Sequence, residues 1–251
     1  MGVLGRQHTG LRYDAYIPER MVRLQLHSSR GRHSCYSRRR CRQPGAHRVL
    51  KKFIAVAGNM GAGKTSLVQF LHQRYGFEPI YEPFADNPYL DDFYKDMKAF
   101  AFRSQLYFLT HKFRLHMGLN RSEGTVVQDR TIYEDAEIFC TNLHHSRKIS
   151  KRDYQLYMEL YNTMRRALQP PDLLIYLRCP VRTIRQRIRV RGRESEQEIP
   201  ARYLRKLNQL YEDWIERYTL SPVMVWDSAR MDYITDLVDR IEFQRKVESF
   251  L

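Results

Sequence analysis

The segment Gly58–Thr65 constrains the fold more than any other part of the sequence. It has glycine at its first and sixth positions, followed by lysine and threonine, which is the pattern GxxxxGK[ST]. It directly follows a short apolar run, residues 53–58, and precedes an amphipathic stretch that begins at Ser66. Between a strand and a helix, such a segment turns sharply and directs backbone N–H groups at phosphate oxygens. The segment therefore predicts a P-loop fold that binds ATP or a related nucleoside triphosphate.

Each part of this segment has an expected role. Lys64 is expected to reach the phosphoryl oxygens, and the Thr65 hydroxyl is expected to coordinate Mg²⁺. The residues expected to bind the nucleotide here are Gly58, Asn59, Met60, Gly61, Ala62, Gly63, Lys64 and Thr65.

After residue 51, five short apolar runs alternate with longer amphipathic stretches. Short runs rich in Val and Ile and bounded by charges or helix breakers indicate buried strands. The amphipathic pattern is clearest in residues 201–218, where apolar residues recur three and four positions apart. The alternation predicts an α/β protein with three layers, a five-stranded parallel sheet between helices on both faces, which binds ligands beyond the carboxyl ends of its strands. The predicted strands are residues 53–58, 79–82, 125–129, 172–177 and 222–226.

The net charge of +15 is concentrated at the N-terminus. The first 52 residues hold eleven arginines and two lysines but only two acids, Asp14 and Glu19. We therefore divide the chain into a basic, disordered extension, residues 1–48, and one domain, residues 49–251. Three interpretations of the extension stay open: a nucleic-acid-binding arm, an arginine-rich organellar transit peptide, or upstream sequence translated in error before a start near Val49.

Composition excludes several other classes of protein. No apolar run approaches the roughly 20 residues that span a bilayer, and no secretory signal follows the first basic residues. The four cysteines form no CxxC pair, which predicts free thiols in a reducing compartment. A zinc site built from Cys35, Cys41, His33 and His47 fits the usual ligand spacing poorly. We expect a cytoplasmic protein without a membrane partner, with organellar targeting by the extension as the alternative.

Charged residues close the second and third predicted strands, at the edge where a parallel sheet binds ligands. Glu82 precedes Pro83, which cannot continue a strand, so its carboxylate is expected in the crevice. It suits a general base for an alcohol acceptor, whereas an anionic monophosphate acceptor would be repelled. Asp129 offers a carboxylate to magnesium, and Arg130 a guanidinium to the transferred group. The structural alternative is a solvated strand end and an ordinary ion pair.

These motifs resemble a known family. From Lys51 onward the chain is similar to the deoxyribonucleoside kinases, most of all to the bacterial deoxyadenosine and deoxyguanosine kinases. The resemblance rests on the P-loop, Tyr81-Glu82-Pro83, Asp129-Arg130-Thr131, an arginine-rich run and Ile199-Pro200. It implies a kinase that transfers the γ-phosphoryl group of ATP, with Mg²⁺, to the 5′-hydroxyl of a purine deoxyribonucleoside, deoxyadenosine or deoxyguanosine, in nucleotide salvage. It also implies a homodimer.

The resemblance assigns the catalytic and metal-binding residues. It makes Glu82 the base that activates the 5′-hydroxyl, and it places Arg130 beside that hydroxyl with Lys64 on the phosphates. Asp129 then holds magnesium together with Thr65. Relatives commonly have Glu-Arg-Ser where this chain has Asp-Arg-Thr, so the acid is one methylene shorter and is expected to hold the metal through water.

The resemblance also implies a nucleoside pocket. Gln105 matches a glutamine that pairs with the base, and Asp135 matches an acid on the same side of the pocket. Phe139 lies four residues after Asp135, on the same helical face, and matches an aromatic residue that stacks on the base. Seven residues after Gln105, relatives often have an arginine where this chain has Lys112, which lacks the planar fork and leaves the base preference open. The residues expected to contact the nucleoside are Glu82, Tyr94, Gln105, Lys112, Arg130, Asp135, Phe139 and Glu196.

Six arginines alternate along residues 182–193, a pattern that composition alone assigns to a solvated face or a nucleic-acid patch. By resemblance, Arg187, Arg191 and Arg193 belong to an arginine-rich lid over the phosphates of ATP. The same resemblance places Asp232 and Tyr233 near the adenine of ATP, and Tyr94 with Glu196 on the 3′-hydroxyl.

Two other functions stay open at this point. One is a nucleoside monophosphate kinase, and the other is a P-loop nucleotide switch with a nucleic-acid-binding arm. Glu82 disfavours both, because neither an anionic acceptor nor a switch needs a carboxylate that activates an alcohol. We therefore do not expect nucleic acid as a partner.

Overall fold

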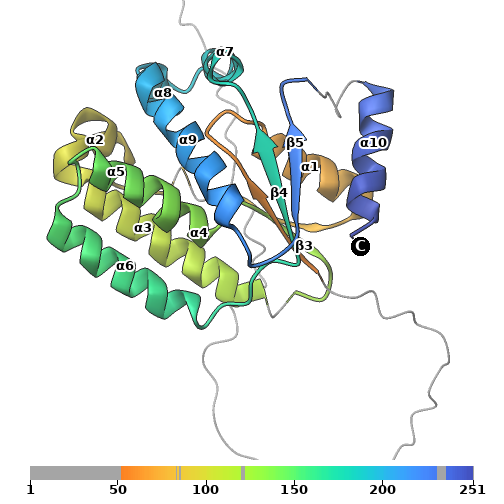
Figure 1. Ribbon diagram of the computed structural model, residues 1–251, viewed down its shortest axis with the longest axis horizontal. Helices are drawn as coiled ribbons and strands as arrows, with labels where there is room; N and C mark the ends of the chain where they lie inside the picture. Colours follow the sequence, from red (N-terminus) through yellow and green to blue (C-terminus); the bar gives the residue numbers. More distant parts are fainter. Residues whose placement is uncertain (1–51, 83, 85, 120–121, 231–235, 251) are drawn as a thin grey trace, which may run out of the picture. The chain divides into compact units, whose positions relative to one another are not determined.

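The computed structural model describes residues 52–82, 84, 86–119, 122–230 and 236–250. At its centre lies a parallel sheet of five strands in the order β2-β3-β1-β4-β5 (Figure 1). The strands are β1 (Phe53–Ala57), β2 (Glu78–Ile80), β3 (Val126–Asp129), β4 (Leu173–Arg178) and β5 (Val223–Asp227). The predicted α/β class and five parallel strands are confirmed, with strand ends within two residues of those predicted.

Helices connect successive strands and cover the sheet. The helices of the first half are α1 (Lys64–Tyr75), α2 (Leu90–Lys95), α3 (Met97–Gly118), α4 (Ile132–Glu134), the π-helix η3 (Asp135–Cys140) and α5 (Thr141–His145). Those of the second half are α6 (Lys151–Arg165), α7 (Val181–Arg191), α8 (Glu194–Gln197), α9 (Ala201–Arg217) and α10 (Leu237–Glu248). The predicted helix over residues 201–218 is thus α9, one residue shorter.

The two faces of the sheet bury separate cores. Successive side chains of a strand point to opposite faces, so Ile54 and Val56 join the core beneath α1 and α10. Phe53 and Ala55 join the other core, beneath α3, α6 and α9. Figure 1 shows these two groups of helices on opposite sides of the strands. Both faces are therefore covered, which explains why the predicted strands are continuous apolar runs rather than alternating ones.

The register brings the ends of β1 and β3 together. Val56 of β1 is paired with Asp129, the last residue of β3, and the Arg130 N–H donates to the Val56 carbonyl at 3.0 Å. The loop that starts at Gly58 therefore lies beside Asp129 and Arg130. Because β1 has β3 on one side and β4 on the other, this is the point where the strand order reverses, the usual ligand crevice of such sheets.

Cys140 and Cys179 are free thiols, as predicted, and both are buried. The basic extension and the suggested zinc ligands lie outside the described residues. In the part of the chain that the structure describes, no helix combines the length and the apolar character needed to cross a membrane.

Candidate active site

The P-loop has the backbone geometry that its glycines predict. Gly58 has φ +149°, and a Cβ there would lie 2.9 Å from the carbonyl oxygen of Leu177. Gly63 has φ 102° and precedes α1, which begins at Lys64. The Lys64 amine is buried and donates to the Asn59 carbonyl at 3.1 Å. Burial, helped by the nearby Arg130, lowers the pKa of Lys64 to about 8.

The Asn59 side chain fastens the P-loop to α9. Its Nδ2 donates to Asn208 Oδ1 at 2.6 Å and to the Leu204 carbonyl at 3.1 Å. Its Oδ1 accepts from the Met60 N–H at 2.8 Å. The Asn59 side chain therefore shapes the loop. The predicted contact of Asn59 with nucleotide would come from its backbone.

Thr65 and Asp129 meet at the edge of the sheet. The Thr65 hydroxyl donates to Asp129 Oδ2 at 2.6 Å. The other carboxylate oxygen, Asp129 Oδ1, is buried and has no hydrogen-bond partner among the described residues. Mg²⁺ prefers hard oxygen ligands and is commonly bound through one or two protein groups plus water and substrate phosphates. A hydroxyl and a carboxylate beside the P-loop fit such an ion.

Glu82 lies in the loop two residues beyond β2, so the expectation that it closes the strand is wrong. Among the described residues β2 is an edge strand, and its pairing with β3 ends at Ile80. The carboxylate still reaches the predicted crevice, where both of its oxygens accept from Arg130 Nη1, at 2.8 and 2.9 Å. Burial alone would raise the pKa of Glu82, but Arg130 and Lys112 hold it well below its usual range.

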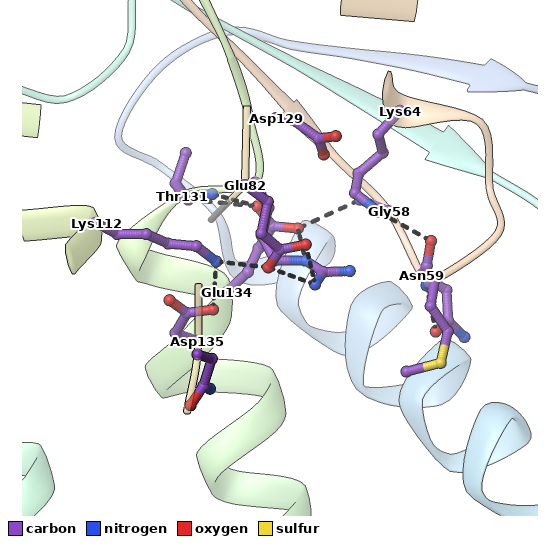
Figure 2. A network of polar contacts seen from close by, with 12 residues as sticks. Gly58, Asn59, Lys64, Glu82, Lys112, Asp129, Thr131, Glu134 and Asp135 are labelled. Atoms are coloured by element: carbon purple, nitrogen blue, oxygen red, sulfur yellow. Dashed lines mark hydrogen bonds and ion pairs between the residues drawn. The ribbon is translucent and has the colours of Figure 1, made fainter. Parts of the chain in front are cut away.

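A second buried ion pair adjoins the first (Figure 2). The Lys112 amine donates to Asp135 Oδ1 at 2.6 Å and to Glu82 Oε1 at 3.0 Å. Burial alone would lower the pKa of Lys112, but the two carboxylates raise it, so the amine stays charged. Burial raises the pKa of Asp135 to about 6, against the pull of Lys112. Asp135 Oδ2 and Gln105 Oε1 are buried without a hydrogen-bond partner in the described part of the chain.

Glu134 is a site residue that our sequence prediction missed. It is fully buried, and its carboxylate accepts from the N–H groups of Gly58 at 3.3 Å and Thr131 at 2.8 Å, and from the Tyr211 hydroxyl at 2.9 Å. It also lies 3.9 Å from Arg130 Nε. Figure 2 shows Glu134 between the P-loop and Thr131. Thr131 and Glu134 form a capping box, and that Thr-x-x-Glu pattern could have revealed the residue.

Arg130 is held in an uncommon conformation. Its φ of 62° lies in the left-handed region, which is rare for residues other than glycine. Its guanidinium lies over the Phe139 ring, 4.4 Å from the centroid. Phe139 is 7% exposed and also belongs to the core. The segment from Asp135 to Phe139 is π-helical rather than α-helical, but residues four apart still share a face in such a helix, so the predicted shared face does not depend on the helix type.

The residues expected at the 3′-hydroxyl and in the lid are divided between Glu196 and the P-loop. Glu196 is buried and pairs with Arg191 and with Arg193 Nη1, the latter at 3.4 Å. Burial raises the pKa of Tyr94, and Glu196 adds to the shift. Arg187 donates to the P-loop carbonyl of Ala62 at 2.9 Å and to the Ser228 carbonyl at 2.5 Å. The roles of these arginines as a lid stay a prediction.

The two residues expected beneath the adenine, Asp232 and Tyr233, lie outside the described residues.

Comparison with known proteins decides what kind of P-loop protein this is. The model of a family described as deoxynucleoside kinase matches residues 54–251. The chain belongs to the deoxynucleoside kinase family. A deoxyadenosine/deoxycytidine kinase of Bacillus subtilis is 36% identical over 195 residues, which are 76% of this chain and 89% of the relative. A deoxyguanosine kinase of Lactobacillus acidophilus is also 36% identical over 195 residues, 74% of this chain and 85% of the relative.

Solved structures agree with the sequence relatives. The deoxyadenosine kinase of M. mycoides with bound dATP superposes with a TM-score of 0.69 at 30% identity, over 78% of this chain and 99% of that one. The same enzyme with dCMP and a flexible dCDP gives a TM-score of 0.70 at 32% identity, over the same shares. The chain is therefore an ATP-dependent deoxynucleoside kinase with a P-loop fold, which agrees with the predicted enzyme class and not with the nucleotide switch.

Proposed function

We propose that this deoxynucleoside kinase phosphorylates the 5′-hydroxyl of a purine deoxyribonucleoside, deoxyadenosine rather than deoxyguanosine, for deoxynucleotide salvage. The observation that carries the choice of base is the pair of buried acceptors without partners, Asp135 Oδ2 and Gln105 Oε1. At neutral pH a carboxyl with a pKa of about 6 is mostly ionised and only accepts hydrogen bonds. The 6-amino group of adenine donates, whereas guanine presents a carbonyl at that position.

In the proposed reaction, Glu82 takes the proton of the 5′-hydroxyl while that oxygen bonds to the γ-phosphorus. The bond from the γ-phosphorus to the β,γ-bridging oxygen breaks, and ADP leaves. Arg130 holds both oxygens of Glu82 and aligns the carboxylate for this transfer. Lys64 would contact the phosphates, and Thr65 with Asp129 would hold Mg²⁺, which neutralises phosphate charge when bound.

A deoxycytidine kinase activity is the second candidate. Cytosine carries a 4-amino donor that the same two acceptors would bind, and a Bacillus subtilis relative is named for both deoxyadenosine and deoxycytidine. Another relative is named deoxyguanosine kinase, so deoxyguanosine is also included among the substrates to be tested.

A steady-state panel tests the proposal. We expect kcat/KM for deoxyadenosine and deoxycytidine to exceed that for deoxyguanosine and thymidine on the order of tenfold or more, the value of a hydrogen bond to a charged group. We expect Glu82→Gln to lower kcat by about two orders of magnitude or more while deoxyadenosine still binds. Higher kcat/KM for a monophosphate, or normal turnover by Glu82→Gln, would refute the proposal.

A further inference from the structure

One buried cation is shared by two carboxylates with different proposed tasks. Lys112 comes from the middle of α3, and its side chain is 1% exposed. Its amine joins Glu82, the proposed general base, to Asp135, the proposed base-recognition acid (Figure 2). The contact to Asp135 is the shorter, 2.6 Å against 3.0 Å. The amine is therefore within hydrogen-bond distance of both carboxylates.

The contact with Lys112 makes Glu82 a poor general base in the free enzyme. Together with the two contacts from Arg130, Lys112 gives the carboxylate three charge-assisted hydrogen bonds. Such bonds favour the ionised form and lower its affinity for a proton. The 5′-hydroxyl must also donate to a Glu82 oxygen before it can lose its proton. The 5′-hydroxyl therefore competes with these donors, and loss of the Lys112 bond would make Glu82 a stronger base.

Lys112 is the partner that can leave. Arg130 is fixed by its main-chain bond to Val56 and by the Phe139 ring beneath its guanidinium. The lysine amine sits on a flexible four-carbon stem and keeps a second partner when it leaves Glu82. That partner, Asp135, has one oxygen in reserve, which a donor on the nucleobase can engage.

We propose that Lys112 is a positioning residue, which restrains Glu82 in the free enzyme and moves to Asp135 alone when the amino group of the nucleobase binds Asp135. Donation by the base to Asp135 Oδ2 fixes the orientation of the carboxylate, which keeps Oδ1 on the Lys112 amine while that amine leaves Glu82. Base recognition thereby strengthens the general base. This inference rests on the proposed function, because it needs Glu82 as the base and a nucleoside as the substrate.

The test compares kcat and KM for deoxyadenosine and purine 2′-deoxyriboside, which lacks only the 6-amino group. For the wild type we expect kcat to be about tenfold or more lower without the amino group, because one charged hydrogen bond to Glu82 persists. In Lys112→Met that bond is gone, so the two kcat values should be equal and the missing amino group should affect KM alone. Lys98→Met, an exposed position of the same helix, should keep the wild-type ratio.

A purely structural role for Lys112 would lower both kcat values together and preserve their ratio, and this result would overturn the proposal. If Lys112→Met does not fold, Asp135→Asn serves, because Lys112 then has no second carboxylate and stays on Glu82. We expect low and equal kcat values for both substrates in that variant, and an unchanged ratio would again overturn the proposal. Failure of the proposed function is a separate result, namely that the wild type does not phosphorylate deoxyadenosine at the 5′-hydroxyl.

Discussion

Replacing Glu134 by alanine should destabilise the fold strongly, although Glu134 is not one of the residues expected to contact substrate. The change leaves three buried donors without their acceptor: Gly58 N–H, Thr131 N–H and the Tyr211 hydroxyl. Each unsatisfied buried donor costs about 1–3 kcal/mol, and removing one partner of a buried charged network costs about 3–5 kcal/mol. Burial also raises the pKa of Glu134, against the pull of Arg130, which shows that the carboxylate itself is costly to bury. We expect a net loss of about 3–5 kcal/mol in the free energy of unfolding.

The assay is urea unfolding followed by tryptophan fluorescence, since the two tryptophans of the chain, Trp214 and Trp226, are both buried. Tyr211→Phe removes one of the three hydrogen bonds and should cost about 1 kcal/mol. Glu242→Ala is the matched control, because Glu242 is half exposed in its pair with Lys246 and such pairs contribute about 0.5 kcal/mol or less. A loss below about 1 kcal/mol for Glu134→Ala would show that the network does not hold the P-loop in place.

Two further predictions concern the phosphate side of the site. Burial lowers the pKa of Lys64 to about 8, so its amine loses charge as the pH rises through that value, and ATP affinity in the free enzyme should fall over the same range. Titration with a fluorescent ATP analogue measures this fall, which Lys64→Arg should remove; a flat wild-type curve would contradict it. Asp129→Asn should raise the Mg²⁺ concentration for half-maximal rate by about tenfold or more. An unchanged Mg²⁺ dependence would mean that Asp129 serves only to hold the Thr65 hydroxyl.

The strands and the P-loop could be predicted because local sequence determines them. Short buried runs such as residues 53–57 leave few alternatives, and the glycine positions follow from backbone geometry. Pro83 predicts a strand that runs to Glu82, but the pairing of β2 with β3 ends at Ile80. Glu134 could have been found from its capping box with Thr131.

The remaining site depends on contacts between distant parts of the chain. Lys112 and Glu82 are 30 residues apart, and their contact results from the packing of α3 against the loop after β2. No spacing in the sequence shows which carboxylate a buried lysine will reach. The π-helical segment that begins at Asp135 was equally hidden, because one extra residue in a helical turn leaves the pattern of apolar residues almost unchanged.

The central position of β1 affects how the protein is made on the ribosome. Of the five strands, β1 is synthesised first, but its neighbours in the sheet are β3 and β4, which are synthesised much later. Until then, a strand whose five residues are all buried in the finished protein has two open edges, which favour aggregation. A nascent chain that has reached only β3 already contains the P-loop, Glu82 and Asp129, yet its sheet lacks one side. Assembly of the active site is therefore a late step in biosynthesis. During elongation, β1 depends for its protection on chaperones that bind nascent chains.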